Sequence, residues 1–302
     1  MNKNVSIAIT AALVMNGGIV NAQEATNIGK HNITLSKDVM TPETLWAMGR
    51  IGSAQASPDG NKIVYQVGYY SVKENRGHQV ICVMDSDGQN VRQLTTSAKS
   101  EGSPVWLDNH TIAFLLDGQI WSMNSDGTNR KKLSSSDIEI EGFRFSPDGK
   151  KVLLIKSIPY YGTIKKNPSD LPKASGRLIT DMNYRHWDHY VETIAHPFVA
   201  EVTANGISKN DVDIIEGEPY ESPLAPFGGI EQFDWSKDSK QIAYTCRKKE
   251  GVKYAVSTDA DIYLYNIDTK NTVNLCKPAD YVEPEINMTK SLRNQKVNHQ
   301  NG

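Results

Sequence analysis

Gln55–Gly60, with the sequence QASPDG, is the stretch that decides the fold of this chain. Pro fixes φ at the second turn position, Asp tolerates the third and Gly closes the fourth, so the stretch predicts a tight turn between two strands. The phrase returns as RFSPDG at Arg144–Gly149, and degenerate copies occur at Val105–His110 and Asp234–Ser239. An apolar run follows each copy, beginning with Lys62–Tyr65. The chain therefore repeats a strand, a turn and a strand.

The spacing of these copies predicts the architecture. Aligned on Ala56, Trp106, Phe145 and Trp235, they lie 50, 39 and 90 residues apart. Repeats of about 40 to 50 residues with short antiparallel strands are typical of propeller blades. We therefore expect an all-β fold, a partial β-propeller of about four TolB- or WD40-like, four-stranded antiparallel blades. The shared position of the aromatic residues predicts that they pack between blades.

The longest spacing leaves two alternatives. It holds either one degenerate blade, with Pro197–Val202 as a strand, or a single blade with a long insertion. We favour the insertion, because residues 158–179 are rich in Pro, Lys, Ser and Gly, as surface loops are. The expected layout is a signal peptide at 1–22, an N-terminal segment with a short helix at 23–50, blades at 51–276 with an insertion at about 158–196, and at 277–302 the start of an incomplete further blade or a disordered tail.

The N-terminus predicts export. Lys3 precedes an apolar stretch at Val5–Val20, and small residues follow up to Ala22, in the order that a signal peptide requires. We expect cleavage after Ala22, a periplasmic or secreted protein, and no membrane span once the signal is removed.

The composition restricts which partners the protein can bind and which roles its cysteines can have. The 33 basic and 35 acidic residues give a net charge of −2, so there is no basic surface field to attract nucleic acid. Three cysteines allow at most one disulfide and belong to no metal-binding cluster, so they are interpreted as buried apolar side chains. The acidic run Glu216–Glu218 and the basic run Arg247–Lys249 are interpreted as exposed turns.

The repeats, together with Tyr184–Tyr190 (YRHWDHY) and Ala195–Val199, resemble the propeller of the prolyl oligopeptidase family of serine peptidases. The resemblance covers Thr41–Asn298 and favours the bacterial dipeptidyl-peptidase and acylaminoacyl-peptidase-like members. The opening Met40–Trp46 also fits, with a short helix capped by Thr41 and with Pro at its first position. The SPDG phrase alone also marks TolB-like propellers.

The resemblance implies a peptidase, but this chain lacks the nucleophile. Family members carry an α/β-hydrolase domain after the propeller, with serine in a GxSxG elbow. No serine here has glycine both two residues before and two residues after it. We therefore expect the front part of such a peptidase, truncated before the catalytic domain, with no catalytic residue, no cofactor and no activity of its own.

The partner predictions follow from the same resemblance. Peptides are the expected substrates of an intact relative. An open set of blades would expose strand edges, so we also expect self-association or binding of other envelope proteins through those edges.

Four residues are predicted to bind substrate. In the resembled family the propeller helps to hold the substrate N-terminus, a task suited to carboxylates for the ammonium group and aromatic rings for side chains. The residues with this chemistry are Trp187, Asp188, Tyr190 and Glu192.

Two other functions remain open from the sequence. A TolB-like propeller could act alone as a protein-interaction module. A metal-dependent hydrolase could use His186, His189 and His196, although their spacing fits no zinc pattern well, and we assign no metal.

Overall fold

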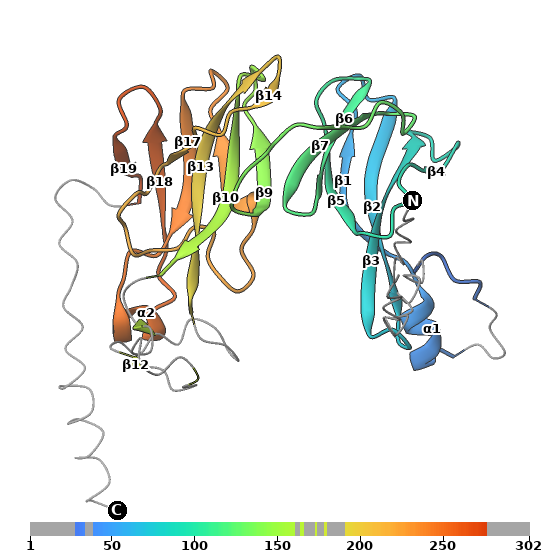
Figure 1. Ribbon diagram of the computed structural model, residues 1–302, viewed down its shortest axis with the longest axis horizontal. Coiled ribbons are helices and arrows are strands. Elements are labelled where there is room, and N and C mark those ends of the chain that lie inside the picture. Colours follow the sequence, from blue (N-terminus) through green and yellow to red (C-terminus); the bar gives the residue numbers. More distant parts are fainter. Residues whose placement is uncertain are drawn as a thin grey trace, which may run out of the picture.

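The computed structural model describes residues 28–33, 39–160, 164–165, 173, 178–179 and 191–276. These residues form four antiparallel sheets of four or five strands, which follow one another in chain order from blue to red (Figure 1). The predicted all-β partial propeller of four blades is confirmed. Of the helices in this part of the chain, none has the length and apolar character needed to cross a membrane.

Strands pair in sequence order in blades 1, 2 and 4, whereas in blade 3 both β14 and β15 pair with β13. Blade 1 contains β1 (Arg50–Ala56), β2 (Lys62–Ser71), β3 (Arg76–Asp85) and β4 (Arg92–Gln93), and blade 2 contains β5 (Glu101–Trp106), β6 (Thr111–Leu116), β7 (Gln119–Asn124) and β8 (Lys131–Lys132). Blade 3 contains β9 (Ile140–Phe145), β10 (Lys151–Pro159), β13 (Thr193–Thr203), β14 (Gly206–Ile207) and β15 (Val212–Asp213). Blade 4 contains β16 (Phe233–Trp235), β17 (Gln241–Cys246), β18 (Asp261–Asn266) and β19 (Thr272–Asn274).

Short elements lie outside the blades. They are α1 (Pro42–Ala47), the pair β11 (Ile164–Lys165) and β12 (Leu178–Ile179), the 3₁₀ turn η1 (Ile230–Gln232) and α2 (Gly251–Val256). Helix α1 begins as the sequence predicts, because the Thr41 side chain accepts a hydrogen bond from the backbone N–H of Thr44 and Pro42 occupies the first turn.

The SPDG turn has the predicted geometry. In blade 1 the N–H of Gly60 donates to the carbonyl of Ser57 at 2.8 Å, and the Ser57 hydroxyl donates to Asp59 at 2.6 Å. The corresponding backbone bond in blade 3, from Gly149 to Ser146, is 2.9 Å. These bonds close the turn, which joins the first two strands of the blade.

Gly60 is the position where this turn depends on glycine. Its φ is +73°, in the left-handed region, and a Cβ there would meet no atom within 4 Å. We expect Gly60→Ala to lower the free energy of unfolding by about 1 kcal/mol, since the cost is backbone strain alone. Urea denaturation followed by circular dichroism measures it. Gly29→Ala is the matched control, because Gly29 has equal space and no positive φ; equal stability of the two variants would contradict the prediction.

Successive blades pack through apolar clusters that each draw on two neighbours. Trp106 and Trp235 are both 7% exposed, and Phe145 packs against the cluster between blades 2 and 3. The indole N–H of Trp106 donates to the carbonyl of Gln55, and that of Trp235 to Arg144, each at 3.0 Å. The predicted packing role of these aromatic residues is confirmed.

The strand at Pro197–Val202 belongs to blade 3. It lies within β13, which pairs with β10 from Lys151↔Glu201 to Pro159↔Thr193. The long spacing in the sequence therefore contains the third strand of blade 3. This strand, β13, begins at Thr193, whereas the preceding strand of the blade, β10, ends at Pro159.

Candidate functional site

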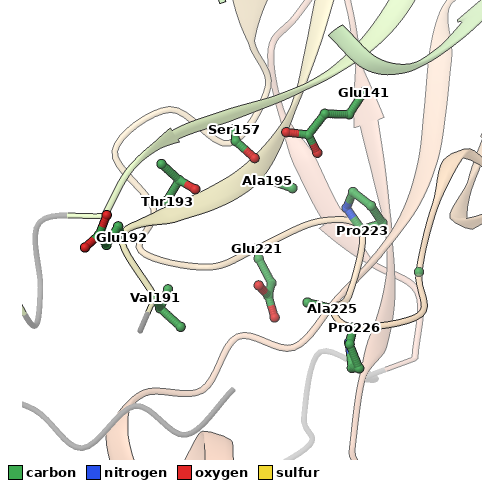
Figure 2. A pocket seen from close by; sticks show the side chains of 11 residues that line it. Glu141, Ser157, Val191, Glu192, Thr193, Ala195, Glu221, Pro223, Ala225 and Pro226 are labelled. Atoms are coloured by element: carbon green, nitrogen blue, oxygen red, sulfur yellow. The ribbon is translucent and has the colours of Figure 1, made fainter. Parts of the chain in front are cut away.

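A pocket of about 450 Å³ lies at the end of blade 3 that is remote from its SPDG turn (Figure 2). The ends of β10 and β13 form one side, and the segment that crosses to blade 4 forms the other. Its lining residues are Glu141, Ser157, Val191, Glu192, Thr193, Ala195, Glu221, Pro223, Ala225, Pro226 and Gly228.

Three carboxylates surround this pocket. Glu141 is on β9, Glu192 directly precedes β13, and Glu221 is on the crossing segment; Figure 2 shows the three on different sides. Lysine, arginine and histidine are absent from its lining in the described part of the chain. Carboxylates accept hydrogen bonds from cationic groups, so this lining is compatible with a cationic ligand.

Glu221 is the buried member of the three. It is 2% exposed, and Oε1 accepts a hydrogen bond from the hydroxyl of Tyr254 on α2. The guanidinium of Arg247 lies 4.6 Å from the centroid of the Tyr254 ring, and its Nη1 donates to the Tyr254 carbonyl at 3.3 Å. Helix α2 thus holds the carboxylate in a fixed position against the pocket.

Ser222, the residue after Glu221, is hydrogen-bonded to strands of two blades. The N–H of Ser222 donates to the carbonyl of Ala195 on β13 at 2.9 Å. The Ser222 hydroxyl donates to the carbonyl of Thr245 on β17 at 2.8 Å. These bonds fix the crossing segment, so the pocket is formed before any ligand arrives.

Only one of the predicted substrate-binding residues can be placed. Glu192 is exposed and lines the pocket. Trp187, Asp188 and Tyr190 lie outside the described residues, as do His186 and His189.

His196 occupies a buried position on β13. It is 0% exposed, and its Nδ1 lies 2.7 Å from Oδ2 of Asp213. No group of metal-ligating side chains occurs in the described ranges.

The pocket includes two carboxylates that the sequence did not single out. Glu141 precedes an SPDG copy by a few residues, and Glu221 follows the acidic run Glu216–Glu218. No motif marks either residue, because the pocket is assembled from segments that only the blade pairing brings together.

The buried thiols are unsuited to nucleophilic chemistry. Burial raises the pKa of Cys246 to about 12 and also raises that of Cys82, so both remain protonated. Cys276 is exposed, contrary to the expectation that all three cysteines are buried.

No protein-family model matches the chain. Among solved structures, the acylaminoacyl peptidase of Pyrococcus horikoshii aligns with a TM-score of 0.50 and 13% identity, over 77% of this chain and 33% of that one. A likeness at this identity concerns the fold alone. Together with the blades, it places the chain in the class of β-propeller folds.

Sequence comparison is more specific. The chain is 41% identical over 280 residues to Dipeptidyl-peptidase 5 of Porphyromonas gingivalis, covering 91% of this chain and 40% of the relative. It is 37% identical to Dipeptidyl-peptidase 5 of Porphyromonas endodontalis, over 80% of this chain and 36% of the relative. The chain is thus a propeller part of the prolyl oligopeptidase family, and it spans well under half the length of these curated relatives.

Proposed function

We propose that the chain is the non-catalytic, substrate-binding propeller portion of an exported serine peptidase, which releases dipeptides from peptides when joined to its hydrolase domain. The acidic pocket carries this proposal, with Glu141, Glu192 and Glu221 receiving the ammonium group at the peptide N-terminus. The names of the two bacterial relatives, both dipeptidyl-peptidases, support the reaction class.

The physical basis is recognition of a charged amine. An ammonium group has three donors, and charge-assisted hydrogen bonds to carboxylates are stronger than neutral ones. Glu221 is already desolvated and oriented, so little further ordering is needed when the cation binds. A peptide with a blocked N-terminus has neither the charge nor the three donors.

Because the catalytic serine of this family lies in the hydrolase domain, we expect the isolated chain to be inactive. It has no GxSxG elbow, and therefore no oxyanion hole of the family type. We expect no release of the chromophore from a dipeptidyl p-nitroanilide by the purified chain. Release at a rate that scales with protein concentration and survives further purification would overturn this part of the proposal.

Binding of a free amine is the direct test. Isothermal titration calorimetry with triglycine should give a dissociation constant at least about tenfold lower than with N-acetyl-triglycine, because acetylation removes a charged hydrogen-bond partner. Glu141→Gln should weaken triglycine binding several-fold. Glu139→Gln is its matched control, since Glu139 is also exposed, lies two residues away and is not in the pocket.

Two results would contradict the assignment of the pocket. One is equal affinity for free and acetylated triglycine. The other is equal weakening by the Glu141 and Glu139 substitutions, which would indicate a general effect of surface charge.

A further inference from the structure

One connection of blade 4 is longer than its counterparts in blades 1 and 2. Residues 72–75 join β2 to β3, and residues 117–118 join β6 to β7. In blade 4, β17 ends at Cys246 and β18 begins at Asp261, and α2 lies between them. We call residues 247–260 the blade 4 insertion. Figure 1 shows its helix α2 at the lower end of the blade.

The insertion is joined to the crossing segment, which connects β15 to η1. Three side-chain contacts make this junction, and they occur in the same order along both segments. The pairs are Lys248 with Glu218, Glu250 with Tyr220, and Tyr254 with Glu221. The first two pairs hold the segments together, whereas the third ends on a carboxylate of the acidic pocket.

The contact between Tyr254 and Glu221 is the most buried of the three. Tyr254 is 5% exposed and Glu221 is 2% exposed. By contrast, the bond from the Tyr220 hydroxyl to Oε1 of Glu250, at 3.2 Å, is exposed to solvent. Hydrogen bonds to charged groups are stronger than neutral ones, and a low local dielectric strengthens them further. The Tyr254 hydroxyl is therefore well placed to orient the Glu221 carboxylate.

Glu221 is held from blade 4 through its backbone as well. The thiol of Cys246, the last residue of β17, donates to the Glu221 carbonyl at 3.5 Å. The Tyr254 ring is in turn fixed by Arg247, which contacts both its face and its backbone carbonyl. The orientation of Glu221 thus depends on blade 4, although the residue belongs to the crossing segment.

We propose that Tyr254 is a positioning residue, which holds the Glu221 carboxylate in the orientation that receives the N-terminal ammonium group of a peptide. The inference rests on the proposed function, because that function assigns the ammonium group to the acidic pocket. A carboxylate offers about four lone-pair sites, so the Tyr254 hydroxyl occupies one site at Oε1 and leaves others for the ligand. A hydrogen bond donated to a carboxylate also favours its charged form, which attracts a cation.

Removal of a single hydroxyl tests this role. Tyr254→Phe keeps the ring and its contact with Arg247 but removes the donor to Glu221. We expect the dissociation constant of triglycine, measured on the full chain by isothermal titration calorimetry, to rise about tenfold, as for loss of a hydrogen bond to a charged group. Binding of N-acetyl-triglycine should not change. Unchanged binding of triglycine by a folded Tyr254→Phe chain would overturn the proposal.

Tyr220→Phe is the matched control. It removes a hydroxyl that joins the same two segments, but this hydroxyl bonds to Glu250 instead of the pocket carboxylate. The variant should therefore bind triglycine within about twofold of the unsubstituted chain, since the contact is exposed and lies outside the pocket lining. Equal weakening by the two substitutions would show that the tyrosines only brace the insertion.

A spectroscopic measurement decides the question even if Tyr254→Phe fails to fold. 3-Fluorotyrosine incorporated at position 254 keeps the hydroxyl and places a fluorine nucleus beside Glu221. Its ¹⁹F resonance should shift as triglycine saturates the chain and should stay in place with N-acetyl-triglycine. The same label at position 220 should respond to neither peptide. A resonance at position 254 that ignores saturating triglycine would contradict the positioning role.

The outcomes for the two proposals are separable. A chain that binds triglycine and N-acetyl-triglycine equally would overturn the proposed function and this inference together. A chain that prefers triglycine, and keeps the preference undiminished in Tyr254→Phe, would retain the proposed function and lose only the role of Tyr254.

Discussion

Arg130→Met is expected to lower the free energy of unfolding by about 3–5 kcal/mol, the cost of leaving a buried charge without its partner. The partner is Glu101, whose side chain is 1% exposed and whose Oε1 accepts from the Arg130 guanidinium. The same guanidinium lies 5.0 Å from the centroid of the Phe114 ring. Urea denaturation followed by circular dichroism measures the change.

A surface ion pair of the same blade gives the control. Lys99 pairs with Asp117, and their side chains are 66% and 55% exposed. Lys99→Met should cost less than about 1 kcal/mol, because solvent screens exposed pairs. The double substitution Arg130→Met with Glu101→Leu should recover much of the stability lost in the single variant, since it removes the orphaned charge. Similar costs for Arg130→Met and Lys99→Met would contradict this account.

Trp235→Ala is expected to destabilise the chain by about 3–5 kcal/mol through the cavity it would leave between blades 3 and 4. Trp235 is buried in the cluster that joins these blades and donates its indole hydrogen bond to the carbonyl of Arg144. Trp235→Phe should cost less, since it keeps most of the apolar contact and loses chiefly the hydrogen bond.

Trp46 of α1 is the comparison for this prediction. It is 44% exposed and contacts Tyr70 edge to face at 5.7 Å, so Trp46→Ala should cost about 1 kcal/mol. Circular dichroism is the suitable readout, because either substitution removes a fluorophore. A Trp235→Ala chain as stable as Trp46→Ala would show that inter-blade packing contributes little here.

Local chemistry accounts for the parts of the fold that the sequence predicted well. The Ser57–Gly60 turn follows from the fixed φ of Pro58 and the positive φ of Gly60, which are properties of single residues. Thr41 and Pro42 likewise mark the start of α1. The repeated aromatic position predicted the packing of Trp106 and Trp235, because each lies at the same place in its blade and faces the preceding blade.

Contacts between distant segments were predicted less well. The runs Glu216–Glu218 and Arg247–Lys249 were interpreted as exposed turns, but Nζ of Lys248 lies 2.6 Å from Oε2 of Glu218. Both side chains are partly buried. The two runs belong to different loops, and their spacing in the sequence does not indicate that they meet. Only the folded structure shows this ion pair.

The sequence by itself determined the blade, its turns and the residues that pack one blade on the next, because these depend on backbone preferences and on a period that can be counted. The tertiary structure alone decided the acidic pocket. Glu141, Glu192 and Glu221 come from three separate segments, and they converge because β10 pairs with β13 and the crossing segment is held between β13 and β17. Such convergence is a property of strand pairing over long sequence separations, which local patterns do not encode.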